Sequence, residues 1–504
     1  MSQRVEKSRL RDGFPDPTEA ENLIYNPSFE RLRVLARHDE TTTEYGSPRY
    51  VSEQKSRSAD RTKNLLDDDF SEADWRAIET ALDEARERKL VCLDRQVGSR
   101  ETSFTCRLYV PREYARIALA WGKLLEPAER EPDFRTLQLP EWDEREGNRR
   151  RIRVLPDTGL TFVLGSDYTG EAKKSFLRLY MYRAKERGGL GIHAGSKRVT
   201  IEDEDGPRTV GQAFLGLSAT GKSTLTGHGC WLDDPERTEM LQDDVCALLP
   251  DGQVTGSEGK GLYIKTDGLD PEEQPGLYDA ATHESAVFEN VWVGSDGTVD
   301  FDNTKLTTNG RAVIQRDRLD SASEDIDLAG IDQIFFITRN PVMPPIARLT
   351  DRQAAVAFML GESIQTSAGD PDAAGESIRV VGTNPFIIGP EGEEGNRFYD
   401  LVAANDVECF VINTGHVGPA NADIGVRESV TILVNAARGS IEWEHDETMD
   451  LELPAAMPGL NVEAFYPPDH YENFESELES LREERREYLD QFETLAEEIK
   501  DAVY

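Results

Sequence analysis

Residues 216–223, GLSATGKS, constrain the fold of this 504-residue chain more than any other feature. They match the phosphate-loop pattern G-x-x-x-x-G-K-[ST], in which glycines let the backbone wrap around phosphate oxygens and the lysine neutralises their charge. The apolar residues 210–215 before the loop predict a strand, and residues 222–227 after it predict a short helix that stops at Gly227 and Gly229. This order of strand, loop and helix indicates a mononucleotide-binding α/β domain.

The loop also predicts a metal-assisted nucleotide site. The Ser223 hydroxyl is placed to contact Mg²⁺, and a second, acidic contact is expected downstream. Asp243 and Asp244 interrupt an apolar run at a suitable distance, although in a chain with 96 acidic residues such a pair is otherwise typical of a solvated turn. The candidate nucleotide-binding residues of the loop are Gly216, Leu217, Ser218, Ala219, Thr220, Gly221, Lys222, Ser223 and Thr224.

A large acidic excess limits the partners of the chain. Lys and Arg number 57 against 96 Asp and Glu, which gives a formal net charge of −39. Such a surface repels nucleic acid and anionic lipid, while 38% hydrophobic residues indicate a globular protein. Because only 14 of the basic residues are lysine, the composition favours an enzyme adapted to concentrated salt, as in a halophile. An ordinary acidic protein is the alternative, and folding at low salt would support it.

The cysteines and the apolar runs predict the compartment. Five scattered cysteines form no CxxC pair and are expected to be buried thiols in a reducing environment. No stretch approaches the roughly 18 apolar residues of a membrane span, and the first residues contain no signal-peptide core. We therefore expect a cytoplasmic protein without a membrane partner.

The chain is predicted to form two α/β domains. Residues 1–70 are rich in turn residues, and a helix is expected after the N-cap Ser71. Strands are expected at 90–96, 102–110, 151–155 and 160–165, with helices at 112–125 and 171–187. The glycine-rich break that follows predicts a boundary between a first domain over 1–188 and a second domain over 189–504 that contains the phosphate loop.

The last predicted element is an amphipathic helix at 472–504. Its apolar residues recur at spacings of three and four with acidic faces between them. The helix could form a coiled coil, but packing on its own domain is favoured because fewer than four heptads are present.

Motifs in a fixed order along nearly the whole chain resemble those of the ATP-dependent phosphoenolpyruvate carboxykinase family. They are RSAD (57–60), YTGEAKKS (168–175), GIH (191–193), GLSATGKST, the aspartate pair, YIKT (263–266), FENVWV with GTVDF, NGRAV (309–313), INTG (412–415) and FYPPDHY near the last helix. The resemblance implies two α/β domains facing each other across a cleft, with ATP on the C-terminal one. It also implies decarboxylation of oxaloacetate to an enolate that takes the γ-phosphoryl group of ATP. GTP-dependent relatives carry a cysteine in the phosphate loop, and none occurs at 216–223, which favours ATP.

The resemblance assigns roles to single residues. Lys174, which would have to be deprotonated, together with His193 and Asp244 resembles the family's Mn²⁺ ligands, while Ser223 and Asp243 would hold Mg²⁺. Arg57 and Tyr168 resemble residues that contact the substrate. The residues that would stabilise charge on the substrate and the triphosphate are Lys173, Lys222, Lys265 and Arg311. Without the resemblance, Arg57 would be predicted to be a surface group and His193 a packed histidine.

The chain departs from the family pattern at four places. Ala219 replaces a glycine of the loop, and residues 245–248 replace the usual Glu-His-Gly-Trp. Gln274 stands where a nucleotide-contacting glutamate is usual. Asp423 aligns with a family arginine near the phosphates, and Arg427 lies four residues further on. The last two departures leave the nucleotide open.

Three functions are consistent with these observations. The first is an ATP-dependent phosphoenolpyruvate carboxykinase that uses Mg²⁺ and Mn²⁺. The second is a divergent phosphate-loop kinase with another acceptor, and the third is a nucleotide-binding scaffold without turnover. The physiological direction, the oligomeric state and any regulation stay open.

Overall fold

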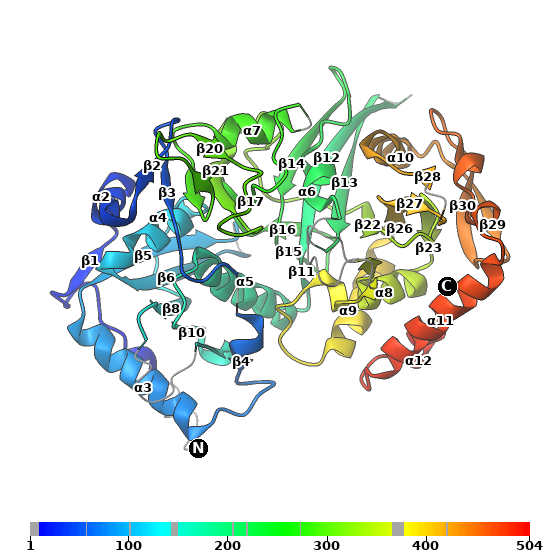
Figure 1. Cartoon of the computed structure of the whole chain (residues 1–504). Helices are drawn as coiled ribbons and strands as arrows, with labels where there is room; N and C mark the ends of the chain where they lie inside the picture. Colours follow the sequence, from blue (N-terminus) through cyan, green and yellow to red (C-terminus); the bar gives the residue numbers. More distant parts are fainter. Residues whose placement is uncertain are drawn as a thin grey trace. The chain divides into compact units, whose positions relative to one another are not determined.

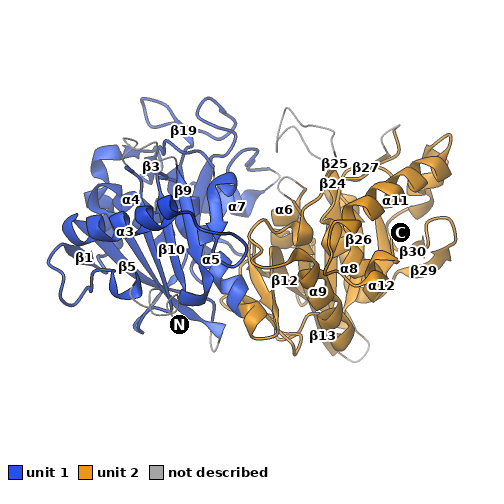
Figure 2. Cartoon of the chain, turned by 90° about the horizontal axis from the view of Figure 1, so that it is seen from below, with its two compact units in different colours: residues 1–183, 257–320 blue, residues 184–256, 321–504 orange. Residues whose placement is uncertain are grey.

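The structure, a computed structural model, describes residues 10–504 except 57, 100–101, 143–149, 204–205, 218–219, 273, 365–376 and 420–421. The described part of the chain divides into two compact units (Figure 2). Unit 1 contains Met1–Arg183 and Ser257–Asp320, and unit 2 contains Ala184–Gly256 and Ser321–Tyr504. Both units combine helices with sheets, which confirms the predicted α/β class.

The division differs from the predicted one in one respect. The boundary expected near residue 188 lies close to the observed change of unit between Arg183 and Ala184. Residues 257–320, however, were expected in the C-terminal domain and lie in unit 1. Strand pairing explains this difference, because strands of this segment join N-terminal strands in one sheet. Its order is β17 (Gly261–Lys265), β21 (Arg311–Gln315), β18 (Val287–Glu289), β3 (Pro48–Tyr50) and β2 (Thr41–Thr42).

The larger sheet of unit 1 is mixed and carries helices on its surfaces (Figure 1). Its strands, in spatial order, are β1 (Leu23–Tyr25), β5 (Leu90–Val97), β6 (Phe104–Pro111), β8 (Phe134–Leu139), β10 (Leu160–Leu164), β9 (Arg151–Leu155) and β4 (Thr62–Asn64), with β7 (Glu126–Pro127) beside β5. The other elements of unit 1 are α2 (Phe29–Leu35), α3 (Glu72–Glu87), α4 (Ala115–Gly122), α5 (Thr169–Glu186), whose last turn belongs to unit 2, α7 (Pro275–Ala281), β19 (Trp292–Val293) and β20 (Val299–Asp300).

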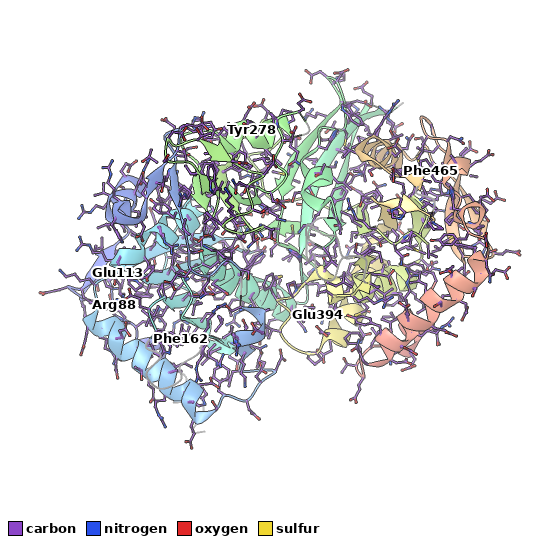
Figure 3. All side chains as sticks on the ribbon, viewed as in Figure 1. Arg88, Glu113, Phe162, Tyr278, Glu394 and Phe465 are labelled. Atoms are coloured by element: carbon purple, nitrogen blue, oxygen red, sulfur yellow. The ribbon has the colours of Figure 1, made fainter. Side chains whose placement is uncertain are left out.

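Alternation along the strands places different side chains on the two faces of this sheet. Leu137 and Leu139 of β8 belong to a buried cluster with Ile78 and Leu82 of α3, and this cluster includes Phe162 (Figure 3). Thr136, which points to the opposite face, shares a 2.9 Å hydrogen bond with Ser175 of α5. The face opposite α3 is therefore the one that holds α5 with its lysine motif.

The main sheet of unit 2 contains parallel strands at its centre (Figure 1). Its order is β14 (Arg237–Gln242), β12 (Ala194–Asp203), β13 (Gly206–Leu215), β22 (Gln333–Thr338), β26 (Glu408–Asn413), β23 (Ile346–Leu349), β30 (Leu451–Ala456) and β29 (Glu442–Asp446). A smaller sheet contains β11 (Leu190–Ile192), β15 (Cys246–Leu248) and β16 (Val254–Gly256). The short strands are β24 (Ser363–Ile364), β25 (Ser377–Ile378), β27 (His416–Val417) and β28 (Ala422–Asp423).

Helices cover both faces of this sheet, so its central strands are apolar on both sides. On one face Leu215 and Phe336 lie in a cluster with α8 (Asp351–Leu360), α9 (Glu391–Asn405), α11 (Phe474–Asp490) and α12 (Glu497–Lys500). On the other face Phe214 and Phe335 pack with α6 (Lys222–Gly227) and α10 (Val426–Arg438). The phosphate-loop segment thus leaves the middle of a strongly buried sheet.

Several predicted elements are confirmed at nearly their predicted bounds. Ser71 caps α3 and forms a capping box with Asp74, and the predicted strands correspond to β5, β6, β9 and β10. The helix predicted at 112–125 is shorter, because residues 112–114 form a 3₁₀ turn before α4. All five cysteines are buried and free, as expected.

The predicted terminal helix is interrupted. α11 ends at Asp490 and α12 begins at Glu497. Leu478, Leu489, Leu495 and Ile499 lie in the buried cluster of unit 2, which confirms packing on its own domain. The turn between the helices lets apolar residues on both sides reach this core. No helix among the described residues combines the length and apolar character needed to cross a bilayer.

Candidate active site

The segment with the phosphate-loop motif lies between a strand and a short helix. β13 ends at Leu215 and α6 begins at Lys222. Gly221, which precedes the helix, has φ of 96°, a left-handed conformation that glycine adopts without strain. Ser218 and Ala219 lie outside the described residues, so the effect of the Ala219 departure is not tested.

A residue of the INTG motif supports this loop. Parallel strands end at the same edge of a sheet, so the segments after β13 and β26 come together. The Thr414 hydroxyl donates to the carbonyl of Thr220 at 2.7 Å, and the Thr220 hydroxyl donates to the carbonyl of Leu217 at 2.8 Å. These hydrogen bonds connect Leu217, Thr220 and Thr414 within unit 2.

His193, Asp244 and Lys222 form a polar cluster beside the loop. Nε2 of His193 lies 2.9 Å from Oδ1 of Asp244 and 3.3 Å from Nζ of Lys222. Strand register explains the first contact, because Ile192 of β11 pairs with Cys246 of β15. His193, which directly follows Ile192, therefore lies close to Asp244, which stands two residues before Cys246. Here the structure brings together three side chains that the motifs predicted separately.

The other imidazole nitrogen determines what His193 can bind. Nδ1 lies 2.7 Å from the carbonyl oxygen of Thr383, which can only accept a hydrogen bond. Nδ1 therefore carries a proton. Nε2 donates to Asp244 when the ring is protonated, and in the neutral ring its lone pair can accept from Lys222 or bind a metal ion. This is the arrangement that a metal-ligating histidine needs.

Asp243 offers a second acceptor beside this cluster. Its Oδ1 is buried and has no hydrogen-bond partner among the described residues. A buried carboxylate oxygen without a donor is costly unless a cation or water satisfies it. Asp243 and Asp244 together thus provide hard oxygen ligands of the kind that Mg²⁺ and Mn²⁺ prefer.

In unit 1 the candidate residues gather around Tyr263. Nζ of Lys173 lies 2.8 Å from Oε2 of Glu258 and 5.5 Å from the ring centre of Tyr263. The guanidinium group of Arg311 lies 5.5 Å from the same ring, and Tyr168 is 6.4 Å from it. Both cations are close enough to be attracted by this ring, because its faces carry negative charge density.

Tyr263 itself is a partly buried hydrogen-bond donor. Burial, together with the neighbouring Glu289 carboxyl group, raises the pKa of the Tyr263 phenol well above its ordinary value of 10. The phenol therefore stays protonated and donates to Glu289. Burial also raises the pKa of Glu289, although Arg116 opposes this effect. The ring is thus held in one orientation.

Strand register also joins Lys265 and Arg311. They are cross-strand partners at the ends of β17 and β21. Arg311 donates to Oδ1 of Asn309 at 2.7 Å, and Asn309 donates to the Tyr168 hydroxyl at 3.3 Å. Nζ of Lys265 lies 3.0 Å from Asp267. Lys265, Arg311 and Tyr168 therefore belong to one connected group in unit 1.

The remaining predicted residues have the following places. Arg57 lies outside the described residues, and Lys174 is half-buried on α5 next to Lys173. Ser223 and Thr224 lie in the first turn of α6. Gln274 directly precedes α7, and Asp423 and Arg427 are both exposed on β28 and α10.

Several residues of these groups were not predicted from the sequence. Tyr263 stands two positions before Lys265 in YIKT, and Asn309 and Thr414 lie inside the motifs NGRAV and INTG, so the motifs carried a signal for them. Glu258 and Thr383 carried none. Glu258 is one of 96 acidic residues, and Thr383 contributes only its backbone carbonyl.

Comparisons with known proteins agree with these motifs. The family described as phosphoenolpyruvate carboxykinase matches residues 24–463. A protein of Aeropyrum pernix named phosphoenolpyruvate carboxykinase (ATP) is 36% identical over 480 residues, which cover 93% of this chain and 94% of the relative. Proteins of the same name from Mesorhizobium japonicum and Brucella anthropi are 30% and 28% identical and cover 66% and 84% of this chain, and 61% and 80% of their own lengths are matched. The chain, with its phosphate-loop segment and its His193–Asp244 pair, therefore belongs to the phosphoenolpyruvate carboxykinase family.

Proposed function

We propose that the chain catalyses the ATP-dependent conversion of oxaloacetate to phosphoenolpyruvate, CO₂ and ADP. The family and the names of its relatives support the reaction. The observation that carries the proposal is the cluster of Lys222, His193 and Asp244 beside the phosphate-loop segment. It combines a phosphate-binding cation with metal ligands.

The proposed reaction has two bond-breaking events. Cleavage of the carbon–carbon bond to the departing carboxylate leaves its electron pair on the enolate of pyruvate. The enolate oxygen then attacks the γ-phosphorus, and the bond from that phosphorus to the β–γ bridging oxygen breaks, so ADP leaves with that electron pair. Negative charge develops on the enolate oxygen and on the bridging oxygen, and cations held near these atoms lower the barrier.

The phosphate-loop residues would bind the triphosphate. Lys222 would neutralise charge on its terminal phosphates, and backbone amides of residues 216–224 would donate to their oxygens. Ser223 and Asp243 would hold Mg²⁺, and the buried oxygen of Asp243 without a hydrogen-bond partner among the described residues supports this role. ATP is the proposed nucleotide, and comparison with GTP tests the departures at Gln274, Asp423 and Arg427.

His193, Asp244 and Lys174 are the proposed Mn²⁺ ligands. Among the described residues no group of three His, Cys, Asp or Glu side chains is placed to hold a metal ion by itself. Lys174 must lose its proton to act as a ligand, which the metal charge promotes. When bound, Mn²⁺ would act as a Lewis acid on the oxygen that becomes the enolate oxygen.

The residues of unit 1 would bind oxaloacetate and stabilise the transferring group. Arg57 would pair with a substrate carboxylate through its two-pronged guanidinium group, and Tyr168 would donate to the substrate. Lys173, Lys265 and Arg311 would face the developing negative charge. The ion pair of Lys173 with Glu258 and the contact of Arg311 with Asn309 fix the directions of these cations.

An assay in molar KCl tests the proposal. Purified protein with oxaloacetate, ATP, Mg²⁺ and Mn²⁺ should form phosphoenolpyruvate and ADP in equal amounts, and GTP should replace ATP poorly. ATP hydrolysis that does not depend on oxaloacetate would instead indicate a kinase with another acceptor. Nucleotide binding without turnover would indicate a scaffold.

Two lysine variants separate the proposed metal site from the phosphate site. Lys174→Ala should abolish the stimulation of turnover by Mn²⁺ and leave the Kd for ATP nearly unchanged. Lys222→Ala should lower kcat by roughly 10²–10³-fold, because it removes a cation that faces the transferring phosphoryl group. Steady-state kinetics with and without Mn²⁺ and calorimetric ATP binding are the measurements. Normal Mn²⁺ stimulation in Lys174→Ala would remove this lysine from the site.

A further inference from the structure

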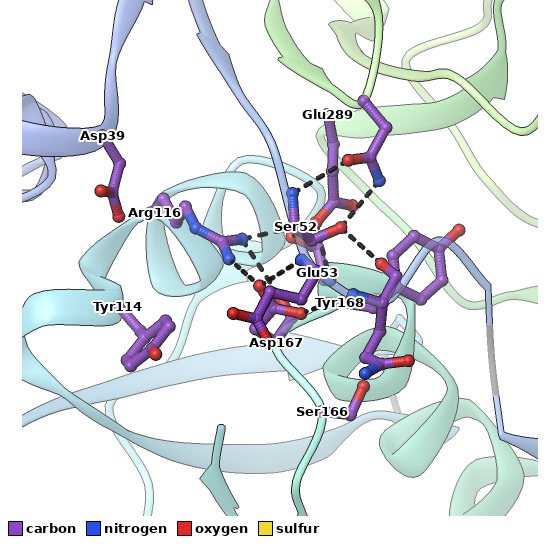
Figure 4. Close-up of polar contacts among 12 residues, drawn as sticks. Asp39, Ser52, Glu53, Tyr114, Arg116, Ser166, Asp167, Tyr168 and Glu289 are labelled. Atoms are coloured by element: carbon purple, nitrogen blue, oxygen red, sulfur yellow. Dashed lines mark hydrogen bonds and ion pairs between the residues drawn. The ribbon is translucent and has the colours of Figure 1, made fainter. Parts of the chain in front are cut away.

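A buried ion pair between Arg116 and Asp167 lies beside Tyr168 in unit 1 (Figure 4). Arg116 of α4 is 3% exposed, and its Nη2 lies 2.7 Å from Oδ2 of Asp167, the residue before Tyr168. Nη1 of Arg116 also donates to the backbone carbonyl of Asp167 at 3.0 Å. Arg116 therefore fixes both the side chain and the main chain of the residue next to the candidate substrate tyrosine.

The Asp167 carboxylate also binds a second segment. The backbone amide of Glu53 donates to Oδ2 at 2.8 Å, and that of Gln54 donates to Oδ1 at 3.0 Å. The backbone amide of Ser52 donates to Oδ1 of Asn290 at 2.9 Å, and Asn290 donates back to the Ser52 hydroxyl at 2.7 Å. Three consecutive amides of this segment are thus bound by side chains of other elements of unit 1.

The segment that begins at Ser52 forms further hydrogen bonds at Gln54 and Ser58. Arg150 donates to the Gln54 side chain and, at 2.7 Å, to the Ser58 hydroxyl. The backbone amide of Ser58 donates to Glu171, three residues after Tyr168. In the sequence, Gln54 and Ser58 stand on either side of Arg57. Asp167 and Glu171 likewise stand on either side of Tyr168. Hydrogen bonds therefore join Gln54 to Asp167 and Ser58 to Glu171.

We propose that Asp167, held by Arg116, is a positioning residue for the oxaloacetate site. It sets the backbone of Glu53 and Gln54 relative to the backbone that presents Tyr168. This inference rests on the proposed function, which gives Arg57 and Tyr168 their roles. A carboxylate suits the task, because its two oxygens accept the two amides and the guanidinium group at once.

The test is a comparison of Michaelis constants. Asp167→Asn keeps the size of the side chain but removes the charge and part of the acceptor capacity. It should raise KM for oxaloacetate at least about tenfold and change KM for ATP by less than about twofold. A role in folding alone would lower the unfolding temperature without separating the two constants.

Asp94 provides a matched control. Its carboxylate forms a similar buried pair with Arg107 in unit 1, with distances of 2.7 and 2.8 Å between strands β5 and β6. Asp94→Asn should lower the unfolding temperature by a similar amount and leave both KM values unchanged. Equal effects of the two variants on KM for oxaloacetate would overturn the proposal.

A second variant covers the case in which Asp167→Asn does not fold. Glu53→Pro removes one amide donor from an exposed position and leaves the pair of Arg116 with Asp167 intact. It should raise KM for oxaloacetate by a smaller factor, again without an effect on KM for ATP. An unchanged KM in a folded variant contradicts the inference. Failure of the wild-type protein to convert oxaloacetate would contradict the proposed function instead.

Discussion

At the scale of single residues, hydrogen bonds decide which atoms of the site can react. The motif GIH predicted His193 as a metal ligand, but not which nitrogen would serve. The carbonyl of Thr383, 190 residues further along the chain, binds Nδ1 and leaves Nε2 for Asp244 and Lys222. Such a contact has no sequence signal, because a backbone carbonyl is the same in every residue.

Lys173 also shows that the sequence alone does not identify the partner of a buried side chain. The sequence marked it as unusual in a lysine-poor chain, and the structure adds Glu258 as its partner at 2.8 Å. Both side chains are 3% exposed. A buried charge needs a partner, so some acid near Lys173 could be expected on physical grounds. Glu258 can be that acid because residues 257–320 belong to unit 1, the unit that also contains Lys173.

A buried carboxyl group in unit 2 leads to a pH prediction. Burial would raise the pKa of Glu362, but Arg485 and Arg379 outweigh this effect and lower it from 4.5 to about 2. Below pH 4.5 the unfolded chain binds this proton before the folded chain does. Glu362 therefore adds stability above pH 4.5 that is lost as the pH falls toward 2, roughly 3 kcal/mol in total.

Glu362→Gln should remove this contribution. We expect the free energy of unfolding at pH 7 to fall by roughly 3–5 kcal/mol, because Arg485 loses its buried partner. The remaining stability should depend less steeply on pH below 4.5, as measured by urea unfolding at constant KCl. Glu452→Gln, which breaks the more exposed pair with Arg348, is the control and should change stability by less than about 1 kcal/mol. Parallel pH curves for Glu362→Gln and the wild type would contradict the assignment.

At the scale of elements, local patterns predicted most helices and strands, and packing decided where they end. α3 has a side-chain cap and an apolar face, both visible in the sequence, and its bounds were predicted well. The terminal helix has an apolar face that continues past Asp490, so periodicity alone predicted no break. The break occurs because Leu495 and Ile499 reach the same core as Leu489 only after a turn.

The contact between β12 and α6 gives a prediction about the phosphate loop. A Cβ atom at Gly195 would lie 2.2 Å from Oγ1 of Thr226, whose hydroxyl donates to the carbonyl of Lys222. Gly195→Ala should therefore displace α6 and raise the Kd for ATP by about tenfold or more, as measured by calorimetry. KM for oxaloacetate should change less.

Two variants control this experiment. Gly330→Ala adds a methyl group in unit 2 where nothing lies within 4 Å, and it should leave ATP binding unchanged. The double variant Gly195→Ala with Thr226→Ala removes the clashing oxygen and should recover part of the affinity. If the two single glycine variants bind ATP equally well, the packing of β12 does not control the loop.

At the scale of the whole molecule, net charge is the dominant feature. A charge of −39 makes the folded chain repel itself, and dissolved salt screens this repulsion. The screening length falls from about 10 Å at 0.1 M to about 3 Å at 1 M. We therefore expect the unfolding temperature to rise by several degrees or more between 0.1 and 2 M KCl, measured by scanning calorimetry.

A variant with fewer acidic residues tests whether charge repulsion causes this dependence of the unfolding temperature on KCl. α11 carries several exposed glutamates, and changing four of them to glutamine reduces the net charge without touching the buried face. The salt dependence should then be weaker and stability at 0.1 M KCl higher. An unfolding temperature that does not change with KCl would contradict the proposed salt adaptation. The four positions are Glu475, Glu477, Glu483 and Glu487.

The amino-acid sequence by itself determined the α/β class, the phosphate-loop segment, the family resemblance and most elements, because these depend on composition and on short-range patterns. The tertiary structure decided the membership of residues 257–320 in unit 1, the orientation of the His193 ring, and the pairs of Lys173 with Glu258 and of Arg116 with Asp167. These features depend on strand pairing and on the need to satisfy buried charges with groups far away in the sequence. In the sequence, any of the 96 acidic residues could be the partner of a given cation. A particular acid needs a particular partner only when folding removes the water around its carboxylate.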